Sequence, residues 1–113
     1  MTVSVESTQG LERRMKVDVP AERVESEIDK RLKDMSRRAK IKGFRPGKAP
    51  MKVIRQQYGA QVREDVVSEM VRNSWIEAIT EHKLRPVGNP RIENHTASRD
   101  VGVSFTAVFE VFP

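Results

Sequence analysis

The chain has 113 residues, 33% of them charged, and a formal net charge of +5. This length suits a single domain, and the absence of cysteine excludes a disulfide framework, a thiol nucleophile and a cysteine-ligated metal site. The opening residues lack the basic and apolar regions of a secretory signal, and no apolar run approaches the roughly 20 residues that span a bilayer, so we expect a soluble cytoplasmic domain with no membrane span.

Two alternating stretches at the start of the chain predict a β-hairpin with one solvated face. Valines alternate with polar residues over 2–8, and one face of 11–19 is apolar except for Arg13. Gln9 and Gly10 lie between the two stretches and predict a tight turn.

A helix of about 20 residues is predicted next. Pro20 suits its first position, where a missing N–H costs nothing, and acidic residues precede basic ones in the order that complements the helix dipole. The apolar positions recur at steps of three or four, at Val24, Ile28, Leu32, Met35 and Ala39. Gly43 is placed to end this helix as a left-handed cap.

After the following loop, the sequence predicts two more helical segments. Pro50 would begin a short one that Gly59 closes, and residues 60–82 would form a second long helix with a wide apolar stripe. Trp75 on that stripe is interpreted as a core anchor.

The C-terminal part predicts two strands, a short one over 91–96 and a strong one over 101–112 whose alternate residues are all apolar. Two strands, a helical block and two strands favour an α+β fold. We therefore expect a four-stranded antiparallel sheet covered on one face by two long helices, with a protruding basic helix–loop–helix tip. Because the chain stops directly after a strong strand, we expect residues 1–113 to be one domain of a longer protein.

No catalytic constellation, metal site or cofactor site is predicted. His82 and His95 have no partner at a metal-ligand spacing, and no carboxylate pair or serine–base pair stands out. Three residues separate Gly43 from Gly47, which fits neither a nucleotide-binding P-loop nor the GXXG loop of KH domains.

The stretch KIKGFRPGKAP, residues 40–50, places Phe44 at the centre of a positive loop. Burying such a side chain stabilises a protein by roughly 1.5–3 kcal/mol, and an aromatic residue beside an arginine is typical of interface hot spots. We therefore interpret Phe44 and Arg45 as an anchor and a charged hook for a partner. In the alternative interpretation, the ring packs into the protein's own core.

Charge is unevenly distributed around this loop. Residues 30–55 contain eleven Lys or Arg and one acid, Asp34, for a net charge of +10, and the remainder carries −5. A positive end on a negative body points to a polyanionic partner at one end: nucleic acid, an anionic membrane or an acidic protein surface. A solvated helix face without a partner is the alternative.

The segment GFRPGKAP resembles the GFRxGxxP signature of the trigger factor family, the ribosome-associated bacterial chaperones. Further similarity lies in VSVESTQGLERR near the start, YGAQVREDV after the loop, and FEVFP at the end. The resemblance covers the whole chain and implies the family's N-terminal ribosome-binding domain.

The resemblance implies docking on the large ribosomal subunit beside the polypeptide exit tunnel, against a tunnel-rim ribosomal protein and adjacent rRNA. Nascent polypeptides would be the clients, with roles in folding, protein export and cell division. The implied ribosome-binding residues are Gly43, Phe44, Arg45, Pro46, Gly47, Lys48 and Pro50, and the auxiliary basic patch comprises Arg37, Arg38, Lys40, Lys42 and Lys52. Relatives often carry lysine at position 46, where Pro46 would stiffen the tip.

Full-length family members also carry a prolyl isomerase domain and a helical chaperone body, which residues 1–113 do not include. The resemblance therefore implies that this chain alone is not an enzyme. Two other interpretations of the tip stay open: a general RNA- or DNA-binding module, and self-association through Phe44.

Overall fold

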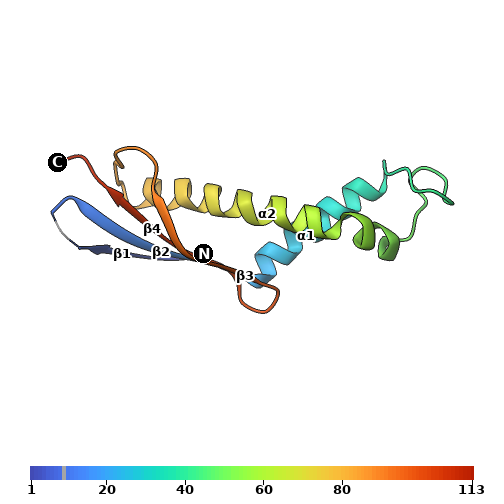
Figure 1. Cartoon of the computed structure of the whole chain (residues 1–113), viewed down its shortest axis with the longest axis horizontal. Coiled ribbons are helices and arrows are strands. Elements are labelled where there is room, and N and C mark those ends of the chain that lie inside the picture. Colours follow the sequence, from blue (N-terminus) through green and yellow to red (C-terminus); the bar gives the residue numbers. More distant parts are fainter. Residues whose placement is uncertain (9) are drawn as a thin grey trace.

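The computed structural model describes residues 1–8 and 10–113 and measures 61 × 25 × 19 Å. Figure 1 shows a β-sheet at one end and a helical arm at the other. The arm consists of residues 21–36, the first half of residues 51–81, and the loop between them. The elements in chain order are β1 (Thr2–Ser7), β2 (Glu12–Pro20), α1 (Ala21–Ser36), α2 (Met51–Glu81), β3 (Arg91–Ser98) and β4 (Gly102–Glu110). The predicted α+β fold class is confirmed.

The sheet is antiparallel throughout, in the order β1-β2-β4-β3. The predicted hairpin is confirmed in β1 and β2, although Gln9 of its expected turn lies outside the described residues. The strongest predicted strand becomes β4, one of the two inner strands of the sheet. It begins one residue late and ends two residues early, so that Val101 is 73% exposed in the preceding turn.

One face of the sheet carries the core. Its buried side chains come from alternate positions of β2 and β4: Met15, Val17, Val19, Val103, Phe105, Ala107 and Phe109. Trp75 of α2 packs edge-on against Phe109, with 4.8 Å between the ring centroids and 77° between the ring planes. The interpretation of Trp75 as a core anchor is confirmed.

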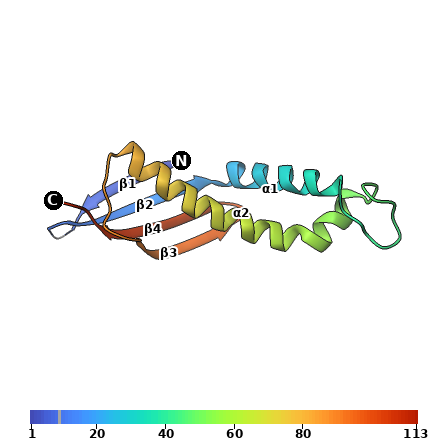
Figure 2. The same ribbon diagram turned by 90° about the horizontal axis from the view of Figure 1, so that it is seen from above.

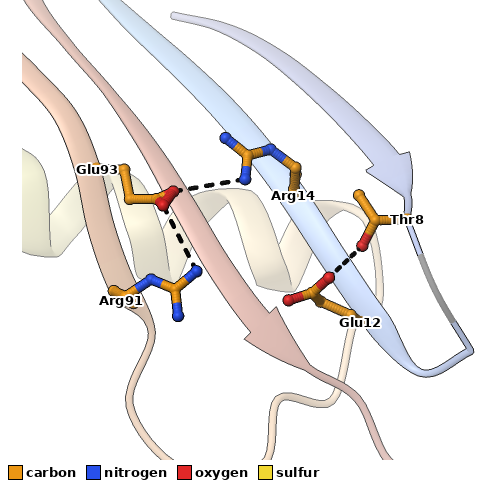
Figure 3. Close-up of polar contacts among 5 residues, drawn as sticks. All are labelled: Thr8, Glu12, Arg14, Arg91 and Glu93. Carbon is orange, nitrogen blue, oxygen red and sulfur yellow. Dashed lines mark hydrogen bonds and ion pairs between the residues drawn. The ribbon is translucent and has the colours of Figure 1, made fainter.

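On the opposite face of the sheet, polar side chains of neighbouring strands contact one another (Figure 3). Glu93 of β3 accepts hydrogen bonds from Arg14 of β2 and Arg91 of β3, each at 3.4 Å. Val108 of β4 pairs with both arginines and is buried between their side chains. Ser104 also donates to Asp18 across the strands, at 2.7 Å. The long polar side chains therefore cover Val108 of β4, while this face of the hairpin stays in contact with water at positions such as Lys16, as predicted.

The predicted helix break at Gly59 is wrong. A single helix of 31 residues, α2, runs through this position. A glycine inside a helix costs only about 1 kcal/mol relative to alanine, and buried side chains on both sides of it hold the helix. The buried and half-buried row recurs at every fourth residue: Ile54, Tyr58, Val62, Val66, Met70, Ser74 and Ala78. A step of four residues exceeds the 3.6 residues of a turn, so this row winds around α2.

The winding of this buried row matches a change in the neighbours of α2 along its length. Figure 2 shows the N-terminal half of α2 running beside α1 and the C-terminal half crossing the sheet. One row of side chains can therefore face α1 first and the strands later. Within the described residues, no helix combines the length and the apolar character needed to cross a membrane.

The first helix is shorter than predicted, and Gly43 is not its cap. Helix α1 ends at Ser36, whose hydroxyl donates to the Lys33 carbonyl at 2.6 Å. The next N–H groups, of Arg37 and Arg38, bond three residues back rather than four. This tightening ends the helix before Ala39. Ala39 is still buried, as the predicted apolar stripe requires, but it lies in the loop and not in the helix.

The two prolines precede their helices instead of beginning them. Pro20 and Pro50 are the N-cap residues of α1 and α2, with extended backbone angles (φ −64°, ψ 148° and φ −61°, ψ 150°). The Pro50 carbonyl accepts hydrogen bonds from Val53 and Ile54. Each helix thus starts one residue later than predicted.

Candidate binding site at the tip of the helical arm

The loop between α1 and α2 forms the tip, defined here as residues 37–50, at the end of the molecule away from the sheet (Figure 1). Three of its side chains, Ala39, Ile41 and Ala49, are buried and belong to the hydrophobic core. Ile54, in the first turns of α2, is fully buried in the same cluster. The tip is therefore anchored by apolar side chains on both sides of its outer part.

The outer part of the tip consists of two consecutive β-turns. In the first, the Phe44 N–H donates to the Ile41 carbonyl at 3.0 Å, and in the second the Lys48 N–H donates to the Arg45 carbonyl at 2.9 Å. Gly43 and Gly47 stand at the third position of each turn with φ of +91° and +78°. Type II turns require positive φ at this position, which glycine adopts without steric cost.

The second turn has the residue types that a type II turn favours, with Pro46 in second place and Gly47 in third. Proline fixes its own φ near −65°, so the turn has little freedom to lose. A further hydrogen bond, from the Gly47 N–H to the Ala39 carbonyl at 3.2 Å, ties this turn back to the end of α1. The two turns therefore form a loop that these three hydrogen bonds hold in one conformation, called the braced loop below.

Phe44 and Arg45 occupy the junction between the two turns. Phe44 is 43% exposed and Arg45 is exposed. The ring is not packed into the protein's own core, contrary to the alternative interpretation of the sequence. It stands next to a guanidinium group on a surface where both groups can reach a partner.

The cationic side chains sort into two groups along the arm. Among the described residues, four arginines bridge the two helices: Arg55 to Asp29 at 2.6 Å, Arg63 to Glu25 at 2.6 Å, Arg31 to Glu69, and Arg23 to Glu77 at 3.8 Å. The Arg31–Glu69 hydrogen bond raises the pKa of the arginine and lowers the pKa of the glutamate. The positive charges of these arginines are therefore paired with acidic side chains of the same two helices.

The cations of the tip and of the adjoining first turn of α2 are different. Among the described residues, Arg37 approaches Asp34 only at 4.0 Å, and no ion pair involves Arg38, Lys40, Lys42, Arg45, Lys48 or Lys52. All of these side chains are exposed. The charge run found in the sequence therefore overstates the free charge, because Arg31 and Arg55 are neutralised within the arm.

The structure brings most of the predicted site residues together. Gly43, Phe44, Arg45, Pro46, Gly47, Lys48 and Pro50 lie in the tip, with Arg37, Arg38, Lys40 and Lys42, and Lys52 lies in the first turn of α2. Sequence reasoning missed the anchors Ile41 and Ala49 and assigned Ala39 to the helix. The alternation of Ala39 and Ile41 with Lys40 and Lys42 is the signal that could have revealed an extended anchor.

The histidines lie away from the tip, His82 at the end of α2 and His95 in β3. Across residues 1–8 and 10–113, no group of three or more His, Cys, Asp or Glu side chains is arranged to hold a metal ion. The chemistry that the tip offers is that of binding: an apolar ring, a guanidinium group and several free cations on a braced loop.

Comparisons with known proteins give consistent results. Residues 1–113 match the family model described as "Bacterial trigger factor protein (TF)". The chain is 55% identical to the trigger factor of Halorhodospira halophila and 51% identical to that of Thioalkalivibrio sulfidiphilus, in each case over 100% of this chain and 26% of the relative. It thus spans about a quarter of the length of these curated relatives.

Among solved structures, one described as "Promiscuous Substrate Recognition in Folding and Assembly Activities of the Trigger Factor Chaperone" matches with a TM-score of 0.62 and 19% identity. The match covers 98% of this chain and 26% of that one. At this level of identity the likeness shows a shared fold.

Proposed function

Since the chain belongs to the trigger factor family, we propose that it docks a chaperone on the large ribosomal subunit, beside the exit of the polypeptide tunnel. The tip is the contact, with a tunnel-rim ribosomal protein and adjacent rRNA as its partners. Nascent polypeptides are the clients that this placement serves. The whole of residues 1–113 acts as the ribosome-binding domain of a longer cytoplasmic protein.

The observation that carries the proposal is the exposure of Phe44 beside Arg45 on a braced loop. Large aromatic side chains and arginine dominate the energetics of protein interfaces. Loops that are ordered before binding lose less conformational entropy on docking. The two turns, the buried anchors and Pro46 supply this order before any partner arrives.

The charge distribution supports the orientation of docking. The free cations of the tip attract rRNA phosphates at long range and release counterions on contact. The part of the chain outside residues 30–55 carries −5 and is repelled by the same surface. The domain therefore approaches tip first, and the sheet stays clear of the ribosome.

The proposal is tested by sedimenting the 113-residue chain with intact ribosomes. We expect Phe44→Ala, Arg45→Ala and an alanine replacement of residues 44–46 each to lower the bound fraction strongly, by about tenfold or more in affinity, as loss of a hot-spot residue does. Matched controls are Phe112→Ala, which removes a ring that is 60% exposed at the other end, and Arg72→Ala on an exposed position of α2. Binding that survives the triple replacement would refute tip docking.

A general RNA- or DNA-binding module is the second candidate, favoured by the unpaired tip cations. Such a module would bind through total charge, so Phe44→Ala would have little effect while neutralising any of several lysines would weaken binding equally. Sedimentation at two salt concentrations separates the two candidates. Self-association through the tip predicts a dimer that Phe44→Ala dissolves, which ultracentrifugation of the free chain would detect.

The longer protein would assist folding and export of new chains and isomerise prolyl bonds through a domain outside residues 1–113. By itself this chain would leave the isomerisation rate of a proline-containing peptide at its uncatalysed value. An acceleration that follows the chain's concentration would contradict this assignment.

A further inference from the structure

The two edge strands of the sheet are not equally protected. β3 shifts its register against β4 between Glu93 and Thr96, and Asn94 adopts a positive φ of 52°. This bulge disrupts the edge, as natural proteins often do to prevent pairing with other chains. β1 pairs with β2 over six residues without a shift, and it contains neither proline nor lysine.

The backbone groups on the free side of β1 can be identified from the hairpin. The Thr8 N–H donates to the Glu12 carbonyl at 3.3 Å, and this pair continues the register in which Thr2 faces Asp18. Hydrogen-bonded and non-hydrogen-bonded pairs alternate in an antiparallel ladder. The even-numbered residues of β1 therefore bond to β2, while Val3, Val5 and Ser7 direct their N–H and C=O groups to the free edge.

The side chains at this edge favour continuation of the sheet. Val3 and Val5 are half-buried and pack at the margin of the core, opposite Val17 and Met15. Thr2, Ser4 and Glu6 point to the polar face and are exposed. An added strand with apolar residues on one face and polar residues on the other would extend both faces of the sheet.

We propose that the free edge of β1 binds an extended segment of unfolded polypeptide by adding it to the sheet as a fifth strand. Backbone hydrogen bonds with Val3, Val5 and Ser7 would provide affinity that tolerates many sequences, and apolar side chains beside Val3 and Val5 would provide selectivity. This choice of occupant rests on the proposed function, which brings unfolded chains to the domain.

A second copy of the chain fits this edge less well. Symmetric pairing through β1 would join six residues from each copy, whereas standard stable interfaces use roughly 20–30 residues a side. The edge thus suits brief, repeated binding of extended peptides better than a lasting dimer.

The test measures fluorescence anisotropy of a labelled eight-residue peptide in which valine alternates with threonine and lysine, with the 113-residue chain and without ribosomes. We expect saturable binding that Val5→Pro weakens by about tenfold or more, because proline removes an edge N–H and its ring obstructs pairing. Val5→Thr keeps the N–H and the branched side chain, so it should change the affinity by less than about threefold. A peptide with two central prolines should not bind.

Two further measurements make the outcome decisive. Amide chemical shifts of the unaltered chain should move on peptide addition at Val3, Val5 and Ser7, which tests the edge even where Val5→Pro fails to fold. Phe44→Ala should leave peptide binding unchanged, so failure of ribosome docking and failure of this proposal are distinguishable. Absence of saturable binding, shifts confined to the tip, or a β1-dependent dimer that binds no peptide would overturn the proposal.

Discussion

At the residue scale, the tip depends on two glycines that are not equivalent. Both Gly43 and Gly47 have positive φ, which favours glycine over any other residue. A Cβ atom at Gly43 would meet open space, whereas at Gly47 it would lie 2.8 Å from the Arg37 carbonyl oxygen. Gly47 is therefore required both by its backbone angle and by the close passage of the loop over the end of α1.

Replacing each glycine by alanine should separate the requirement for a positive φ, which both positions have, from the requirement for space beside the Arg37 carbonyl, which only Gly47 has. Gly43→Ala should lower the free energy of unfolding by about 1 kcal/mol, the cost of a strained φ. Gly47→Ala adds a clash with backbone and should cost about 2–3 kcal/mol or displace the second turn. Urea unfolding measures the stabilities, and ribosome sedimentation should show the larger loss for Gly47→Ala. Equal effects of the two changes would contradict the importance of the Arg37 carbonyl.

At the scale of elements, α2 links the tip to the sheet as one continuous helix of about 46 Å. Its buried row winds from the α1 side to the sheet side, so the same helix serves two layers. Gly59 lies within this helix with an ordinary φ, and a Cβ there would meet nothing within 4 Å. Nothing in the structure requires glycine at this position.

Gly59→Ala should therefore stabilise the protein. Alanine has the higher helix propensity and less freedom in the unfolded chain, so we expect a gain of about 0.5–1 kcal/mol in the free energy of unfolding. Thermal and urea unfolding of the two chains provide the measurement. A loss of stability would show that α2 is interrupted at Gly59 in solution, as the sequence first suggested.

At the scale of the whole molecule, the net charge differs from the positive charge that is free to contact a partner. Arg23, Arg31, Arg55 and Arg63 form ion pairs between α1 and α2, whereas among the described residues no tip cation other than Arg37 forms an ion pair. The Arg55–Asp29 pair is exposed and contributes at most about 1 kcal/mol to stability, whereas the Arg31–Glu69 and Arg63–Glu25 pairs are partly buried. These ion pairs also remove Arg31 and Arg55 from the free positive charge of residues 30–55, which leaves that charge on the tip and the residues beside it.

Lys52 and Arg55, one turn apart on α2, test this distinction. Both are exposed, but Arg55 pairs with Asp29 at 2.6 Å, whereas the structure records no ion pair for Lys52. We expect Lys52→Gln to weaken ribosome binding and to reduce the slope of log affinity against log salt by up to about one. Arg55→Gln should change that slope much less. The result would be contradicted if both replacements altered the slope equally.

The sequence by itself determined the order of elements and the place of the site. Period-two alternation marked β1, β2 and β4, and period-3.6 spacing marked both helices, because these patterns follow from the geometry of single elements. The loop around Phe44 stood out because glycine, proline and charge do not form a core. These signals are local, so one sequence suffices to read them.

Only the tertiary structure decided where helices end and which charges are free. Gly43 could cap a helix or form a turn, and Gly59 could break a helix or lie inside one, since a penalty of about 1 kcal/mol is outweighed by packing with other elements. Likewise, Arg31 finds Glu69 thirty-eight positions away, across two helices. Such outcomes depend on which distant residues are brought together, and no local pattern in the chain records that.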